Sequence, residues 1–145
     1  MRFGCLRGFR SLQMHEFQLR VYFEDTDLAG IVYYANYLKF IERARSEFIR
    51  TLGVDQVALK RDFDTVFAVR AVSVDYLQPA RFDDLLCVQT QITTVGGARV
   101  GLAQTVRRDA TVLVVAEVTL VCLTESGRPT RIPAEVSNKL QSLTQ

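Results

Sequence analysis

One stretch of this sequence carries a clear helical repeat of apolar residues, and it constrains what the rest of the chain can do. The repeat has spacings of four, three, four and four residues, which place its members on one stripe of a helix: Tyr37, Ile41, Ala44, Phe48 and Leu52. Gly53 follows, where a left-handed residue commonly ends a helix. We therefore expect a helix over residues 36–52, with one apolar face that another element must cover.

Strand patterns fill most of the remaining chain. Residues 16–23 alternate imperfectly between apolar and polar side chains, as a half-buried strand does. After the helix we expect a polar connector through Asp64, and then four runs rich in Val, Thr and Leu predict strands at 66–77, 85–95, 99–107 and 111–123. The last run is apolar on both faces, which is typical of an interior strand, and Pro133 can open a short terminal helix. The order predicts an α+β fold in which the long helix packs on one face of a five-stranded antiparallel sheet.

The composition fits a single domain with a short extension. The chain has 145 residues, of which 48% are hydrophobic, and this is enough for one globular core without a second domain. We expect residues 14–145 to form that domain. Residues 1–13 contain three arginines and no acidic residue, and we expect a disordered or dispensable extension ahead of a natural start at Met14. A targeting role for this extension is the alternative.

The charge and hydropathy patterns argue against two classes of partner. The formal net charge is +2, and the basic excess is confined to residues 1–13. Nucleic-acid binding needs instead a basic stripe on a folded face. No apolar run approaches the roughly 18 residues of a membrane span. We therefore expect a soluble, cytoplasmic protein with no nucleic-acid partner and no membrane span.

Three carboxylates crowd the junction between the first strand and the helix. Glu24, Asp25 and Asp27 lie just ahead of Gly30, and such crowding is electrostatically unfavourable unless the charges are used. Aspartates are also common in loops, where they make side-chain turns and caps. The spacing alone leaves a catalytic role and an ordinary loop role open.

Other catalytic plans lack the residues they need. His15 is the only histidine, it stands at the start of the first strand, and we expect it at the surface. There is no G-x-S-x-G elbow for a Ser-His-Asp hydrolase, and no histidine cluster or cysteine pair for a zinc site. Gly96, Gly97 and Gly101 lack the lysine of a phosphate-binding loop and predict a hairpin. An enzyme with this sequence must use carboxylates and backbone dipoles, with no metal and no cofactor.

A longer pattern joins the carboxylate loop to the helix. Residues 20–53 read RVYFEDTDLAGIVYYANYLKFIERARSEFIRTLG, in which a D-x-D-x-x-G-x-V-Y block leads into a Y-x-x-x-x-E-x-A-R helix. Residues 69–86 continue it as VRAVSVDYLQPARFDDLL. The combined pattern strongly resembles hotdog-fold acyl-CoA thioesterases, most closely the Tol-Pal-associated and the 4-hydroxybenzoyl-CoA types. The resemblance implies a sheet wrapped around the long helix, and subunits paired into homodimers or homotetramers with substrate sites at their interface.

The resemblance also implies roles for the residues of the loop. Asp27 matches the catalytic aspartate of the family, and Asp25 is its supporting neighbour. The backbone N–H of Tyr34 matches the donor that polarises the thioester carbonyl at the helix start. Asp27 either attacks the carbonyl directly or activates a water, and the sequence does not decide between these roles. The residues expected to contact the substrate are Gly30, Val32, Tyr33 and Arg99.

Some positions depart from the family pattern or keep two interpretations. Many Tol-Pal-type relatives carry a histidine where this chain has Tyr34, so a mechanism that needs a histidine there is excluded. The Tyr34 side chain either lines the acyl pocket or packs in the core. Gly30 either lets the backbone approach the thioester or serves as a plain turn residue. Glu42 lies opposite the apolar stripe, and we expect a structural role there, paired with Lys39 or Arg45 on the helix surface.

The phosphates of CoA call for basic residues near the site. Arg99, Arg107 and Arg108 are candidates by resemblance of region, and a solvated strand position is the alternative for each of them. We therefore expect hydrolysis of an acyl-CoA thioester, or of an acyl-carrier-protein thioester, to a free acid and a thiol. A non-catalytic acyl-binding module attached to envelope or lipid-synthesis machinery is the alternative. A dehydratase ranks last, because such enzymes pair a histidine with a carboxylate and His15 is misplaced for that task.

Overall fold

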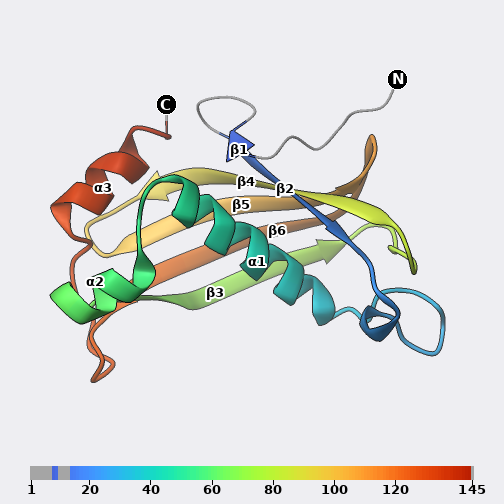
Figure 1. Cartoon of the computed structure of the whole chain (residues 1–145), viewed down its shortest axis with the longest axis horizontal. Coiled ribbons are helices and arrows are strands. Elements are labelled where there is room, and N and C mark those ends of the chain that lie inside the picture. Colours follow the sequence, from blue (N-terminus) through green and yellow to red (C-terminus); the bar gives the residue numbers. More distant parts are fainter. Residues whose placement is uncertain (1–7, 10–13, 145) are drawn as a thin grey trace.

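The computed structural model describes residues 8–9 and 14–144, and it has the predicted α+β plan (Figure 1). The helices are α1 (Asn36–Thr51), α2 (Gln56–Phe63) and α3 (Ala134–Gln141). The strands are β1 (Gly8–Phe9), β2 (Met14–Arg20), β3 (Val66–Tyr76), β4 (Leu85–Val95), β5 (Arg99–Arg108) and β6 (Thr111–Leu123). Most of the extension predicted at residues 1–13 lies outside the described residues.

The strands form one antiparallel sheet in the order β1-β2-β4-β5-β6-β3. The five predicted strands are confirmed, and the two-residue strand β1 adds to the sheet beside β2. β6 lies between β5 and β3, as its two apolar faces predicted. β3 forms the other edge, and within the described residues no strand pairs with its outer side.

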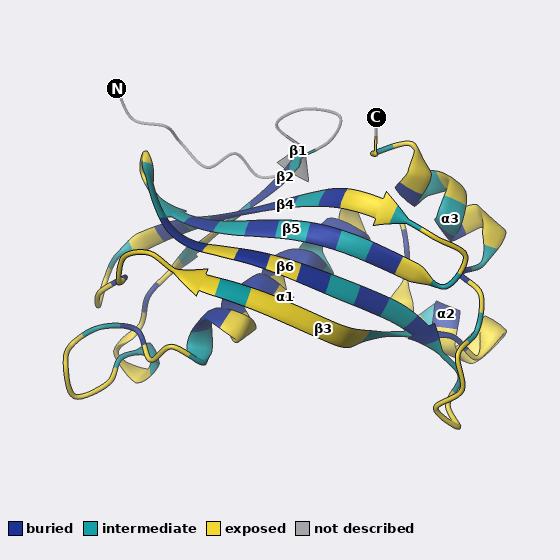
Figure 2. Ribbon diagram, turned by 180° about the vertical axis from the view of Figure 1, so that it is seen from behind, coloured by how far each residue is buried: buried dark blue, intermediate teal, exposed yellow. Residues whose placement is uncertain are grey.

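The long helix α1 lies across one face of the sheet (Figure 1). Its predicted stripe is confirmed, because Tyr37, Ile41, Ala44 and Phe48 are buried and Leu52 packs at the margin of the core. Buried residues alternate with less buried ones along β5 and β6, which Figure 2 shows as bands on the strands. Removal of these facing apolar surfaces from water, at roughly 25 cal/mol per Å², is the main term that holds helix and sheet together.

A short second helix replaces the polar connector that the sequence predicted after α1. The carboxylate of Asp55 caps α2 by accepting hydrogen bonds from the N–H groups of Val57 (2.9 Å) and Ala58 (3.1 Å). Leu59 is the only buried residue of α2. A helix of eight residues with one buried side chain has no apolar stripe, so the periodicity of the sequence did not reveal it.

Two polar side chains that were expected at the surface lie inside the molecule. His15 is 2% exposed, its ring lies 5.7 Å from that of Phe48, and burial lowers its pKa. Arg45 is 9% exposed and donates to Oε1 of Gln104 at 3.1 Å, while Nε2 of Gln104 donates to the carbonyl of Ile41. The surface prediction was wrong for His15 because β2 directs this side chain toward Phe48 of α1, and for Arg45 because β5 covers that side of the helix.

Candidate active site

The loop between β2 and α1 is built around a tight turn at Asp27. The N–H of Gly30 donates to the carbonyl of Asp27, and the N–H of Asp27 donates to the carbonyl of Ile31, each at 2.9 Å. Gly30 has a φ of 79°, which only glycine adopts without strain, and a Cβ there would meet no atom within 4 Å. The turn interpretation of Gly30 is therefore confirmed. A close approach of this residue to a substrate stays a prediction.

The Asp27 carboxylate is exposed, and the protein uses only one side of it. Its Oδ1 accepts a hydrogen bond from the N–H of Ala29 at 2.9 Å, which closes a side-chain turn. Within residues 14–144, no donor is bonded to Oδ2. One oxygen fixes the side chain, and the other is accessible for attack on a carbonyl carbon or for taking a proton from water.

Asp25 joins this loop to the first turn of α1. Its carbonyl accepts hydrogen bonds from the N–H of Tyr33 and from Nδ2 of Asn36, each at 2.9 Å. Its carboxylate accepts from the N–H of Tyr22 at 2.8 Å in the 3₁₀ turn Phe23–Asp25, which ends the first strand earlier than predicted. We did not predict a role for the Asn36 side chain from the sequence, although an asparagine at the start of a helical stripe commonly hydrogen-bonds to the neighbouring backbone.

The N-terminus of α1 has no side-chain cap. Ala35 precedes the helix and makes no capping hydrogen bond. Among the described residues, no acceptor takes the backbone N–H of Tyr34 or of Ala35. Such N–H groups at a helix start carry a partial positive charge. They are suited to bind an oxygen that gains negative charge during a reaction.

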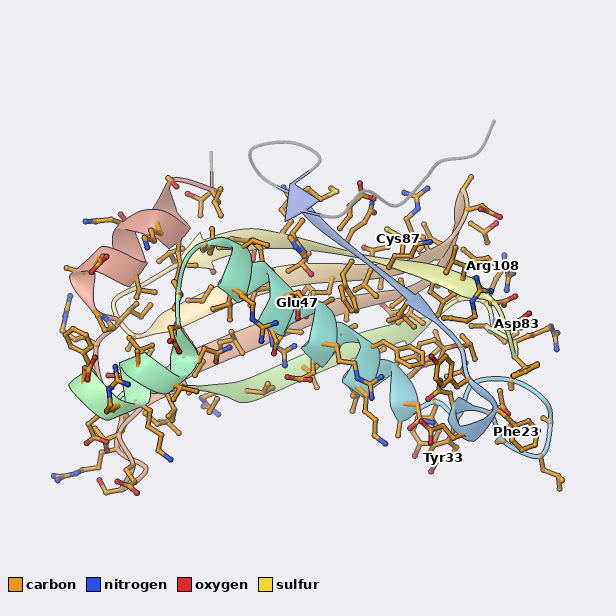
Figure 3. All side chains as sticks on the ribbon, viewed as in Figure 1. Phe23, Tyr33, Glu47, Asp83, Cys87 and Arg108 are labelled. Atoms are coloured by element: carbon orange, nitrogen blue, oxygen red, sulfur yellow. The ribbon has the colours of Figure 1, made fainter. Side chains whose placement is uncertain are left out.

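Tyrosine rings surround this helix start. The ring of Tyr34 lies 4.9 Å from that of Tyr33 and 6.1 Å from that of Tyr76, whose hydroxyl donates to the carbonyl of Tyr34 at 3.0 Å. The neighbouring Tyr34 hydroxyl is the main cause of a raised pKa at Tyr33, and the Asp27 carboxylate is a smaller cause in the same direction. Tyr34 is 61% exposed, so the packed core role is wrong for this chain. Figure 3 shows Tyr33 at the same end of the molecule as Phe23.

The segment between β3 and β4 lies beside the loop and holds it. The carbonyl of Ala80 accepts from the N–H of Val32 at 2.9 Å, and the N–H of Ala80 donates to the hydroxyl of Tyr37 at 3.0 Å. Arg81 pairs with Ile31 in an isolated antiparallel bridge. Val32, which was expected to contact substrate, is 3% exposed, and its side chain packs in the core.

Two other predicted residues lie away from Asp27. Arg99 is the first residue of β5, whereas the Asp27 loop lies near the last residue of that strand, Arg108. One chain therefore does not bring Arg99 to the loop. Glu42 is exposed on α1 and accepts a hydrogen bond from the hydroxyl of Ser46 at 2.7 Å. Among the described residues no ion pair joins it to Lys39 or Arg45, the partners expected for it, and its structural role stays a prediction.

Three further features of the described chain bear on function. An apolar cavity at the other end of α1, lined by residues that include Phe48, Leu52 and Leu140, offers no group for acid-base chemistry. In the described residues, no group of three His, Cys, Asp or Glu side chains is placed to hold a metal ion. No helix in this part of the chain combines the length and the apolar character that crossing a membrane requires.

Comparison with known proteins identifies the family. The model of the Thioesterase superfamily matches residues 29–118, a stretch that includes α1 and most of the sheet. The chain belongs to the thioesterase superfamily. Among superfamily members, the acyl-CoA thioesterase YbgC of Haemophilus influenzae is 41% identical over 83% of this chain and 89% of its own length. The acyl-CoA thioester hydrolase YbgC of Escherichia coli O6:H1 is 44% identical over 72% of this chain and 78% of its own length.

Solved thioesterase structures share the fold. A probable thioesterase from Bartonella henselae has a TM-score of 0.80 at 39% identity, and the match covers 83% of this chain and 99% of that one. A 4-hydroxybenzoyl CoA thioesterase has a TM-score of 0.83 at 20% identity, over 88% of this chain and 99% of that one. The resemblance and the hotdog fold predicted from the sequence are thereby confirmed.

Proposed function

We propose that this thioesterase hydrolyses acyl-CoA thioesters with Asp27 as the reacting carboxylate. One observation carries the proposal: an exposed carboxylate with one oxygen unused by the protein stands in the loop that feeds an uncapped helix N-terminus. A carboxylate and a set of free N–H groups are what attack on a thioester carbonyl needs. The names of the two YbgC relatives, which describe acyl-CoA hydrolysis, support this choice of substrate class.

The reaction follows from these two groups. The carbonyl oxygen of the thioester accepts a hydrogen bond from the backbone N–H of Tyr34, which stabilises the negative charge that develops on it. In one route Asp27 adds to the carbonyl carbon, the carbon–sulfur bond breaks, CoA leaves as a thiolate, and water then hydrolyses the mixed anhydride. In the other route Asp27 takes a proton from water, and the resulting hydroxide adds to the same carbon; the carbon–sulfur bond then breaks, and the proton held by Asp27 passes to the departing CoA sulfur. Both routes yield one carboxylic acid and one CoA thiol.

We also propose that a second copy of the chain pairs along β3 and completes the site. β3 is an edge strand, and its helix-side residues Val69 and Val72 are 50% and 41% exposed. On α1, Leu38 is 40% exposed. Apolar side chains next to unpaired strand edges favour association with another chain. Light scattering is expected to give a dimer or a tetramer, and a monomer at working concentration would contradict the proposal.

The catalytic proposal is tested by CoA release from a panel of short, long and aromatic acyl-CoA substrates. Asp27→Asn is expected to lower kcat by about 10²- to 10⁴-fold, because an amide neither attacks a carbonyl nor takes a proton at neutral pH. The amide oxygen can still accept from the N–H of Ala29, so the turn is preserved. Glu24→Gln is the matched control, since Glu24 is an exposed carboxylate in the same loop, and it is expected to retain wild-type activity.

Two results would contradict this assignment. Wild-type turnover in Asp27→Asn would show that another group reacts with the thioester. Tight acyl-CoA binding without turnover by the wild-type protein would favour the non-catalytic acyl-binding module instead.

A further inference from the structure

Arg108, at the end of β5, is hydrogen-bonded to the segment between β3 and β4. Its Nη1 donates to Oδ2 of Asp84 at 2.8 Å and to the carbonyl of Pro79 at 3.2 Å. The Arg108 and Asp84 side chains are only 32% and 23% exposed. Oδ2 of Asp84 also accepts from the N–H of Arg81 at 2.8 Å. The pair therefore fixes both ends of residues 79–84.

A chain of hydrogen bonds leads from this pair to Asp27. The segment that Arg108 fixes accepts the N–H of Val32 at the carbonyl of Ala80, at 2.9 Å. Arg81, the next residue of this segment, pairs with Ile31 in an antiparallel bridge. The carbonyl of Ile31 in turn accepts a hydrogen bond from the N–H of Asp27 at 2.9 Å. The backbone position of Asp27 thus depends on a segment that Arg108 holds together with the backbone of Val21 and the hydroxyl of Tyr37.

We propose that Arg108 is a positioning residue for the catalytic loop rather than a ligand of the CoA phosphates. The proposal rests on the proposed function of Asp27 for its kinetic consequences. The Arg108 guanidinium is held against its own chain, because Nη1 is bonded to a carboxylate and a carbonyl, and its charge is paired with that of Asp84. Half-burial strengthens this ion pair, because water screens it less than a pair at the surface.

The exposed ion pair on the other side of the same segment offers a comparison. Nη1 of Arg20 donates to the carbonyl of Asp83 at 2.7 Å and lies 3.5 Å from its Oδ1. These side chains are 47% and 68% exposed, so water screens their attraction. Loss of Arg20 is therefore expected to disturb the segment less than loss of Arg108.

The kinetic test measures kcat and KM for two substrates that carry the same acyl group, one on CoA and one on pantetheine, which lacks the nucleotide phosphates. Arg108→Gln is expected to lower kcat by about 10- to 100-fold on both substrates, because a misplaced catalytic group loses rate rather than binding. KM is expected to stay within about threefold. Arg108→Lys keeps the charge but not the planar fork, and it is expected to restore part of kcat.

Arg61→Gln is the matched control, because Arg61 makes an Arg–Asp ion pair of the same length, 2.8 Å, with Asp62 on the exposed surface of α2, away from the Asp27 loop (Figure 1). It is expected to leave kcat on both substrates within about twofold of wild type. A loss for Arg108→Gln that appears in KM for the CoA thioester and vanishes for the pantetheine thioester would overturn the proposal, since it would place Arg108 on a phosphate. An unchanged kcat would overturn it equally. If Arg108→Gln fails to fold, the Arg108→Lys variant carries the same comparison.

A second measurement is independent of turnover and so separates this proposal from that for Asp27. Hydrogen exchange of the full-length protein, followed by mass spectrometry, reports on the N–H groups of Asp27 and Val32. Arg108→Gln is expected to speed exchange in residues 27–32, whereas Arg61→Gln is expected to leave it unchanged. Unchanged exchange in Arg108→Gln would overturn the positioning role even if the wild-type enzyme is active. Faster exchange with an inactive wild type would support positioning while rejecting the proposed function.

Discussion

The two ends of helix α1 differ in how the backbone is satisfied. At the C-terminal end, the carbonyls of Phe48, Ile49 and Arg50 all accept further hydrogen bonds, and the chain leaves the helix through Gly53. At the N-terminal end, the N–H groups of Tyr34 and Ala35 find no acceptor in the described chain, as noted above. One end of the same helix is closed by its own chain, and the other is left open.

The start of α2 shows that an uncapped helix start is not general in this chain. Asp55 caps α2 with its carboxylate, whereas Ala35 supplies no cap to α1. An absent cap costs about 1 kcal/mol of stability. The difference teaches that the helix start beside Asp27 keeps donors available for an external oxygen at the expense of stability, which agrees with its proposed use.

The largest expected effect concerns the second copy of the chain that is proposed to pair along β3. Val72→Lys is expected to weaken the dimer at least about tenfold, because pairing along β3 would bury an unpaired charge. Activity per chain is expected to fall with the dimer fraction. Light scattering and CoA release over a dilution series measure both. Ser73→Lys, on the opposite face of the same strand, is the control, and equal dissociation by both variants would argue against helix-side contact.

A smaller effect sharpens the comparison of the two ends with a matched pair of glycines. Gly30 and Gly53 have φ values of 79° and 78°, so alanine at either position costs about 1 kcal/mol of backbone strain. Gly30→Ala is expected to lower kcat about tenfold, because it displaces the turn that presents Asp27. Gly53→Ala is expected to lower the melting temperature by about as much as Gly30→Ala does, and to leave kcat unchanged. Equal kcat values in the two variants would show that the turn geometry does not matter for activity.

The smallest effect concerns the capped helix. Asp55→Ala is expected to lower the free energy of unfolding by about 1 kcal/mol, since the N–H groups of Val57 and Ala58 lose their acceptor. CoA release is expected to match wild type. Urea denaturation measures the first quantity, with Asp55→Asn as a control that retains an acceptor. A loss of activity in Asp55→Ala would mean that the two ends of the molecule are coupled.

The sequence also shows where local patterns stop being informative. The apolar stripe of α1 and the strand patterns predicted the main elements, since periodicity reports which face of an element is buried. The turn role of Gly30 was one of two interpretations left open; its positive φ confirms the turn and leaves the approach to a substrate as a prediction. The burial of His15 and Arg45 was not foreseen, because it depends on how the helix and the sheet pack against each other.

By itself, the sequence determined one long helix, an antiparallel sheet and a carboxylate loop between the first strand and the helix, because each is encoded by neighbours along the chain. Only the tertiary structure decided which distant groups meet. It placed Arg108 on Asp84 and put Arg99 at the far end of β5. It also brought the hydroxyl of Tyr37 to the N–H of Ala80, 43 residues away. Such contacts depend on strand order and register, which no local spacing encodes.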